Sequence, residues 1–396
     1  MDAFFPSTTG LLHDDSPHRA GIVADSVPRP GSKSGGNHTP VTQYPSNFYA
    51  GPGKLPESVL LRIRDELTDY RGTGFSVMEI SHRAQPVLDL IERTEEKLRA
   101  LMGLPADDAV LFLQGGGSLQ FLMVPMNLSA ASDPVDYVDT GYWAAKAVDA
   151  ARSLDRDVHV AGRNHCAIPS RLDIRPDARY LHLCTNNTVA GTQWREFPLS
   201  PVPLVADMSS DILSRSIDHG RFALIYAHAQ KTIGVAGVTV VILSRKTLET
   251  IRPGLPPFFD YRTHVEARSN YHTPPVFAIY VVECMLDWIA GEIGGLPALE
   301  TLNNHKAALL YETLDASRLF HCPVPSGSRS KMNVVFETVD PKIEPFFRRE
   351  ASAAGLLGLE GHRSRGGFRA SIYNPVTLSD VEQLNGFIAD FEKRYG

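Results

Sequence analysis

The sequence predicts an α/β protein with a large, mainly parallel sheet, followed by a smaller α+β part. Apolar segments of strand length alternate with segments of helical periodicity between residues 57 and 293. Several of the strand-like segments end in glycine, aspartate or lysine, as strands do when they carry a ligand site at their carboxyl ends. The pattern changes after Gly294 and Gly295, where one helix, two strands and a last helix are expected.

The spacing of apolar residues predicts the helices and strands. Helical spacing with charged outer faces predicts helices over 57–70 and 86–103, and an apolar run predicts a buried helix over 118–128. Strands are expected over 109–114, 135–143, 179–188, 202–210, 223–231 and 238–244. The C-terminal part should hold helices over 296–316 and 379–396 and strands over 331–339 and 368–374.

These elements predict four parts of the chain. Residues 1–44, rich in Ser, Pro and Gly, are expected to form a flexible extension that is not a secretory signal. Residues 45–56 should pack with the small domain. A large domain is expected over 57–293 and a small C-terminal domain over 294–396.

Composition excludes several function classes. The 396 residues are 43% hydrophobic and 21% charged, and a net charge of −6 without a basic stripe argues against nucleic-acid binding. The apolar stretch at 276–282 is too short to span a membrane. Four cysteines lie far apart and form no CxxC pair, so we expect neither a disulfide framework nor a metal site. They favour a reducing compartment, and hence a cytoplasmic location.

Three segments carry candidate chemistry. In LFLQGGGSLQF, glycines follow a strand and precede a helix, which is typical of an anion site, although a tight turn is the simpler interpretation. Asp207 ends the apolar strand of VADMSS, where a carboxylate is costly without a protonated partner, although a helix cap is the alternative. Lys231 in AHAQKTIG sits among small residues between two apolar runs, and a lysine there can lose its proton and attack a carbonyl.

Together with the aromatic ring of Trp143, these segments indicate pyridoxal phosphate (PLP) as a cofactor. The aspartate would keep the pyridine nitrogen protonated, the lysine would form a Schiff base, the glycine segment would hold the phosphate and the ring would stack. Two His–Arg pairs, at 82–83 and 362–363, and Arg369 favour an anionic substrate, although each pair alone is typical of a protein surface.

Because of these motifs, the chain resembles the phosphoserine aminotransferase family, which belongs to the class V, fold-type I PLP-dependent aminotransferases. The resemblance covers residues 47–396. It rests on eight motifs in order: NFYAGPGKLP, SVMEISHR, GGGSLQF, YVDTGYWAAKA, DMSSDILSRSID, AQKTIG, TPPVFAIY and GHRSRGGFRASIYN.

The resemblance implies roles at the cofactor. Lys231 would form the Schiff base, Asp207 would pair with the ring nitrogen and Trp143 would stack on the ring. Thr188 would hydrogen-bond the phenolic oxygen. The phosphate would be held by Gly117, Ser118 and Gln230 and, across the interface of a homodimer, by Thr273 and His272.

It also implies substrate contacts and an activity. Arg369 would bind the α-carboxylate, and the distal anion would be received by His82, Arg83, His362 and Arg363. The expected reaction is transamination of 3-phosphohydroxypyruvate with L-glutamate, which gives O-phospho-L-serine for serine biosynthesis.

Three departures leave the substrate open. His272 replaces the asparagine usual in the family, Ser118 stands where some members have arginine, and Arg365 often has an uncharged counterpart and is a candidate to compensate. An aminotransferase for another anionic 2-oxo acid, such as the phosphorylated four-carbon acid of vitamin B6 synthesis, is therefore the alternative. A cysteine desulfurase or lyase is disfavoured because Gln230 precedes Lys231, and a non-catalytic binding protein because both lysine and aspartate are present.

Overall fold

A seven-stranded sheet forms the centre of the computed structural model, which describes residues 45–396. The expected flexible extension, residues 1–44, lies outside the described residues. The strand order is β2–β10–β9–β8–β5–β3–β4. The strands are β2 (Ala109–Leu113), β3 (Pro134–Asp139), β4 (Asp157–Arg163), β5 (Leu181–Cys184), β8 (Leu204–Asp207), β9 (Phe222–His228) and β10 (Thr239–Leu243).

The sheet is mainly parallel, as predicted. Strands β4, β3, β5, β8 and β9 pair in parallel, whereas β10 runs antiparallel to both β9 and β2. The chain reaches β10 through the short turn that holds Lys231, and only antiparallel strands can be joined by so short a connection.

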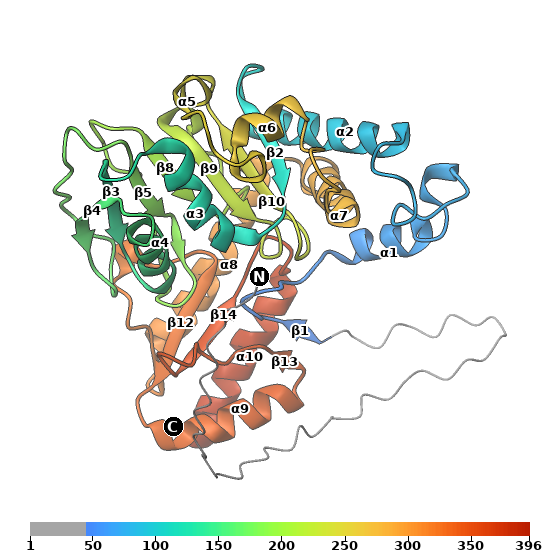
Figure 1. Cartoon of the computed structure of the whole chain (residues 1–396). Coiled ribbons are helices and arrows are strands. Elements are labelled where there is room, and N and C mark those ends of the chain that lie inside the picture. Colours follow the sequence, from blue (N-terminus) through green and yellow to red (C-terminus); the bar gives the residue numbers. More distant parts are fainter. Residues whose placement is uncertain (1–44) are drawn as a thin grey trace, which may run out of the picture. The chain divides into compact units, whose positions relative to one another are not determined.

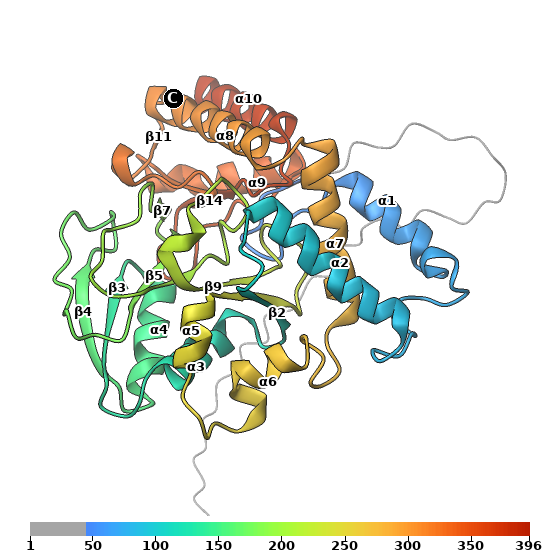
Figure 2. The same ribbon diagram turned by 90° about the horizontal axis from the view of Figure 1, so that it is seen from above.

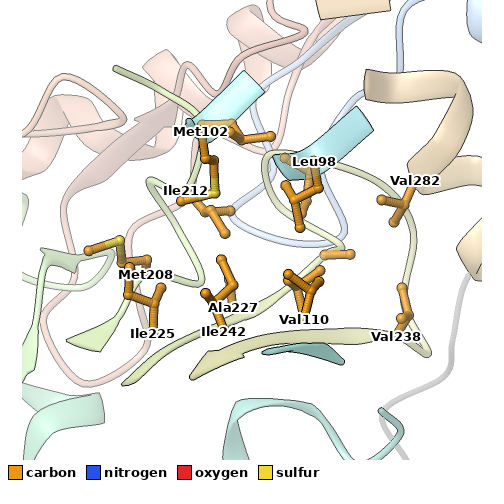
Figure 3. Packing of buried hydrophobic residues seen from close by; sticks show 14 of the residues in the cluster. Leu98, Met102, Val110, Met208, Ile212, Ile225, Ala227, Val238, Ile242 and Val282 are labelled. Carbon is orange, nitrogen blue, oxygen red and sulfur yellow. The ribbon is translucent and has the colours of Figure 1, made fainter. Parts of the chain in front are cut away.

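Helices cover both faces of this sheet (Figure 1). On one face α3 (Gly116–Leu128) and α4 (Tyr142–Arg152) pack over residues such as Leu111, Tyr226 and Val241. On the other, α2 (Gln85–Met102) and α7 (Val276–Asp287) pack over Val110, Ile225 and Ile242, and Figure 3 shows this contact. Because neighbouring residues of a strand point to opposite faces, both layers bury apolar side chains from the same strands.

The C-terminal part has a sheet and a core of its own. Strands β11 (Phe320–His321), β12 (Asn333–Thr338) and β14 (Phe368–Ser371) form a three-stranded antiparallel sheet. Helices α8 (Leu296–Ala316), α9 (Glu344–Ala353) and α10 (Leu378–Tyr395) pack with it around Phe347 and Phe391, and Figure 2 shows α8 and α10 side by side. The predicted domain boundaries stay a prediction.

The segment before α1 (Glu57–Glu66) reaches the C-terminal part. Strand β1 (Ser46–Asn47) pairs in parallel with β13 (Leu356–Leu357). The Lys54 ammonium forms an ion pair of 2.5 Å with Asp380, near the start of α10. These contacts fix the loop between them, residues 48–53, which runs beside Lys231.

Several local predictions were wrong. The strands expected over 202–210 and 223–231 end at Asp207 and His228, and helix α9 was not predicted. The helix expected over 57–70 ends at Glu66. The strand expected over 135–143 ends at Asp139, because Gly141 adopts a φ of 147° that turns the chain into α4. The strand expected over 179–188 breaks at Thr185. Edge strand β4 was missed because its side chains are only partly buried and carry no clear apolar pattern.

Within residues 45–396, no helix is both long and apolar enough to cross a bilayer.

Candidate active site

The carboxyl ends of the central strands surround a cavity of about 190 Å³. Asp207 is the last residue of β8, Lys231 follows β9, and α3 begins just after β2. Open α/β sheets bind ligands at this edge. The lining residues are Gly116, Gly117, Ser118, Phe121, Trp143, Cys184, Asn186, Asp207, Ser209, Ser210, His228, Gln230 and Lys231.

The first turn of α3 forms one end of the cavity. Gly116 has a φ of 66°, and a Cβ atom there would lie 3.3 Å from the His228 Nδ1, so the position favours glycine. The amide of Leu119 already donates to the Gly115 carbonyl, whereas Gly117 and Ser118 precede it at the open start of the helix. Free amides and the helix dipole make this end of the cavity suited to an anion.

Asp207 supplies a buried carboxylate. The side chain is 7% exposed, and its Oδ1 accepts a hydrogen bond of 2.9 Å from the Ser209 amide. Burial raises the pKa of Asp207, while Ser209 and the charge of Lys231 oppose that rise. A carboxylate in such a place favours a cationic or protonated neighbour.

Lys231 supplies an amine without a protein partner. Within residues 45–396 its Nζ makes no hydrogen bond and no ion pair, and it lies 5.7 Å from the centre of the Trp143 ring. The side chain is reached by solvent through the cavity, but protein surrounds it elsewhere. Burial lowers the pKa of Lys231, Asp207 raises it and Arg369 lowers it again. The pKa of Lys231 is lowered overall, so a larger fraction of its amine is neutral and nucleophilic.

These residues fit the predicted PLP. Asp207 and Lys231 carry opposite charges and line one cavity, yet they form no ion pair within the described residues. The anion-binding turn and the Trp143 indole line the same cavity. A flat aromatic ligand with a basic nitrogen, a carbonyl carbon and a phosphate would therefore find a partner for each group.

Arg369 reaches this region from the small sheet. Its Nη1 donates a hydrogen bond of 2.9 Å to the Thr188 carbonyl, and its buried Nε has no partner within the described residues. The Thr188 hydroxyl accepts a hydrogen bond of 3.3 Å from the Trp143 indole. Arg369, Thr188 and Trp143 therefore form one connected group, which leaves part of the guanidinium available to an anionic ligand.

The two residues of the second His–Arg pair lie in different surroundings. The His362 ring lies 5.2 Å from the Tyr142 ring, which in turn lies 5.1 Å from that of Trp143, so His362 is near the site. Arg363 is exposed. Arg365 donates to the Ala190 carbonyl over 3.4 Å and its Nε lies 3.6 Å from a Glu337 oxygen.

The remaining predicted residues do not line this cavity. The carbonyl of Thr273 accepts a hydrogen bond of 3.2 Å from the Gln114 side chain. The carbonyl of His82 accepts one of 2.9 Å from Asn270, which ties His82 and Arg83 to the segment containing His272 and Thr273. The predicted roles of these four residues stay predictions.

Sequence reasoning missed several lining residues, among them Cys184, Asn186 and His228. The His228 Nε2 lies 3.1 Å from the Gln230 Oε1, so His228 supports a residue that was predicted. A polar residue at the end of a buried strand was the available signal. Among the described residues, no group of three His, Cys, Asp or Glu side chains is arranged to hold a metal ion.

Comparison with known proteins then gives the family. Residues 46–384 match the model of the class-V aminotransferases. Phosphoserine aminotransferase of Desulfatibacillum aliphaticivorans is 47% identical over 355 residues, covering 88% of this chain and 98% of its own. Those of Geobacillus kaustophilus and Bacillus subtilis are 48% and 44% identical, with the same coverage of both chains.

Solved structures agree with this result. Phosphoserine aminotransferase from Bacillus circulans subsp. alkalophilus superposes with a TM-score of 0.87 at 41% identity, covering 90% of this chain and 100% of its own. The PLP-bound phosphoserine aminotransferase from Trichomonas vaginalis gives a TM-score of 0.83 at 37% identity, with 87% of this chain and 99% of its own covered.

The two charges flanking Lys231 should shift its reactivity in opposite directions. Asp207→Asn removes the group that raises the pKa of Lys231, so more of the amine should be neutral at pH 7 and modification by an amine-directed reagent should be faster. Arg369→Gln removes a group that lowers this pKa and should slow modification.

The measurement is the pH dependence of Lys231 labelling in the cofactor-free protein, followed by peptide mass spectrometry. The exposed Lys393 is the internal control and should react equally in all three proteins. Shifts of the same sign in both variants would contradict the electrostatic account of the site.

Proposed function

The chain belongs to the class-V aminotransferases and, within them, to the phosphoserine aminotransferase family, and we propose that the cavity around Lys231 is its active site. The enzyme is PLP-dependent and transfers an amino group from L-glutamate to 3-phosphohydroxypyruvate, which gives O-phospho-L-serine and 2-oxoglutarate. This reaction serves serine biosynthesis. One observation carries the assignment of the site. Lys231 and Asp207 line the same cavity but form no ion pair with each other.

PLP, when bound, accepts the electron pair released at the α-carbon of the substrate and carries the amino group between the two acids. Asp207 would hold a proton at the pyridine nitrogen, because a positive neighbour stabilises its buried carboxylate. Trp143 would stack on the ring, and the Thr188 hydroxyl would hydrogen-bond the phenolic oxygen. Gly117, Ser118 and Gln230 would bind the phosphate at the start of α3.

Lys231 has two tasks. Its neutral amine would attach the cofactor covalently until an amino substrate takes its place. The freed amine would then act as a general base that removes the proton from the substrate α-carbon, and as a general acid that gives this proton to the carbon of the cofactor to which the amino group is bound. The lowered pKa of Lys231 favours both tasks, because attack and proton removal need the uncharged amine.

Arg369 and His362 orient the substrate. Arg369 would present its Nε, which has no partner in the part of the chain that the structure describes, to the α-carboxylate, while the Thr188 carbonyl holds Nη1. His362 lies beyond Trp143 and, with Arg363, faces the second anion. L-Glutamate and O-phospho-L-serine both carry such an anion, so one pocket serves both half-reactions.

We also propose that the enzyme is a homodimer with shared active sites. His272 supports this, because both of its ring nitrogens are buried and lack a partner within the described residues. Large apolar side chains near His82 and His272 are exposed, namely Phe75, Met78 and Tyr271. In this arrangement Thr273 and His272 of one protomer complete the phosphate site of the other, and His82 and Arg83 reach its substrate. A cytoplasmic location is proposed as well, since all four cysteines are free thiols.

The half-reaction tests the activity. O-Phospho-L-serine and L-glutamate, added separately to the PLP-loaded protein, should each shift the visible absorbance to that of the aminated cofactor. L-Serine and L-alanine should do so at least about a hundredfold less efficiently, because they lack the second anion.

A response to glutamate without one to phosphoserine would replace the acceptor with another anionic 2-oxo acid. A protein that develops no visible band with PLP would contradict the cofactor assignment.

Complementation tests the shared site. Lys231→Ala should lower activity at least about a thousandfold, since it removes the general base. A second variant, His82→Ala with Arg83→Ala, should lose substrate binding. If the site is shared, co-expression of the two forms mixed dimers with one intact site and should restore about a quarter of wild-type activity.

If each chain instead supplies its own His82 and Arg83, no mixed dimer contains an intact site. Absence of recovery, with mixed dimers shown by mass spectrometry, would then contradict the proposed sharing.

A further inference from the structure

A second buried lysine, Lys306 on α8, takes no part in the proposed reaction. Its side chain is 0% exposed. The Nζ donates to the carbonyl oxygens of Val376 at 2.8 Å and Tyr373 at 2.9 Å, and lies 3.3 Å and 3.5 Å from those of Ile372 and Asn374. An ammonium has three N–H donors, so these four acceptors use all of them.

The four carbonyls belong to one short segment, residues 372–376. It follows β14, which carries Arg369, and precedes α10. The Tyr373 carbonyl also accepts a hydrogen bond of 2.9 Å from the Val376 amide, but the other three carbonyls have no donor besides Lys306 within residues 45–396. Without Lys306 they would be buried and unpaired, which costs more than a neutral hydrogen bond gains. The Lys306 amine therefore supplies the donors that the carbonyls of this bend need.

One contact leads from the segment to the carbonyl beside Lys231. The Asn374 Nδ2 donates to the Thr232 carbonyl over 3.3 Å and to that of Leu213 over 3.2 Å. The Oδ1 of Asn374 accepts a hydrogen bond of 3.0 Å from Asn303, which lies one turn before Lys306 on α8. Asn303 and Lys306 thus fix the side chain and the main chain of Asn374 from one helix.

A second contact reaches the other side of Lys231. The Tyr373 hydroxyl donates a hydrogen bond of 2.8 Å to the Ala50 carbonyl. Its ring lies against Gly53, where an added Cβ would be 3.1 Å from the Tyr373 Cδ2. The Gly53 amide in turn donates 2.8 Å to the Gln230 carbonyl. The two residues next to Lys231 in the chain, Gln230 and Thr232, are therefore both held by contacts that begin at residues 373 and 374.

The electrostatic surroundings of Lys306 are compatible with this task. Burial lowers its pKa to about 7, the carboxylate of Asp380 raises it and the charge of Lys54 lowers it. Asp380 is itself held by Lys54, Thr377 and Ser46 at the start of α10. A buried lysine is costly to keep, so its presence calls for an explanation beyond filling space.

We propose that Lys306 is a positioning residue for Lys231: it gathers the carbonyls of residues 372–376 and thereby holds Asn374 and Tyr373 against the main chain of Gln230 and Thr232. The inference rests on the proposed function only in taking Lys231 as the reactive amine. It concerns how that amine is placed, because Lys306 itself lies outside the cavity lining.

The test compares three variants of the full chain. Lys306→Met keeps the length of the side chain and removes its donors. Asn374→Ala cuts the contact with Thr232 but leaves Lys306 in place. Leu314→Ala is the control, because it opens the apolar core of the C-terminal part eight residues further along α8, about 12 Å from Lys306.

Two readouts separate positioning from simple loss of stability. Hydrogen–deuterium exchange of residues 229–235 in the cofactor-free protein should be at least about tenfold faster in Lys306→Met and Asn374→Ala, and within about twofold of wild type in Leu314→Ala. In the PLP-loaded protein, the pH at which the visible band changes should shift in the first two variants alone. The double variant should show less than the sum of both effects.

Wild-type exchange and an unshifted band in Lys306→Met, at lowered thermal stability, would overturn the inference. If Lys306→Met does not fold, an Asn374→Ala protein that resembles wild type in both readouts overturns it equally. Failure of the proposed function gives a different result: the wild type would form no visible band, and the exchange measurement would still decide the role of Lys306.

Discussion

An amine that must remain free of protein partners is the constraint on which this structure depends. Lys231 and Asp207 are opposite charges in one cavity, and the obvious outcome of burying them together is an ion pair. The fold prevents it. Asp207 is fixed at the end of β8 and bonded to the Ser209 amide, while Lys231 sits in the turn after β9. A cofactor can occupy the space between them and bind both side chains.

The two buried lysines show how partners decide what a lysine does. Burial lowers the pKa of Lys231 and of Lys306 alike. Lys306 is surrounded by main-chain carbonyls, so its donors are used and its place is fixed. Among the described residues, the Lys231 amine has no hydrogen-bond acceptor and lies near the Trp143 ring in the cavity. Reactivity therefore follows from the absence of acceptors around one amine, and rigidity from their presence around the other.

Local patterns predicted the fold and the cofactor side of the site because each signal lies at a strand end. The strand before Asp207, the glycines before α3 and the lysine after β9 are all visible within a few residues. Sequence could not place what depends on distant contacts. Nothing local shows that Arg369 reaches Thr188 from another sheet or that Lys306 meets residues 372–376. The Asn270 side chain links the segment of His82 to that of His272, outside the cavity lining, and the predicted roles of both residues stay predictions.

The most direct test of this account is to find which lysine binds the cofactor. The protein is saturated with PLP, reduced with borohydride to make the attachment permanent, digested and analysed by mass spectrometry. The account predicts one modification per chain, on the peptide containing Lys231, with Lys306 unmodified. Attachment at Lys306 or at an exposed lysine, or no specific attachment, would contradict the claim that the free amine of Lys231 is the centre around which the site is built.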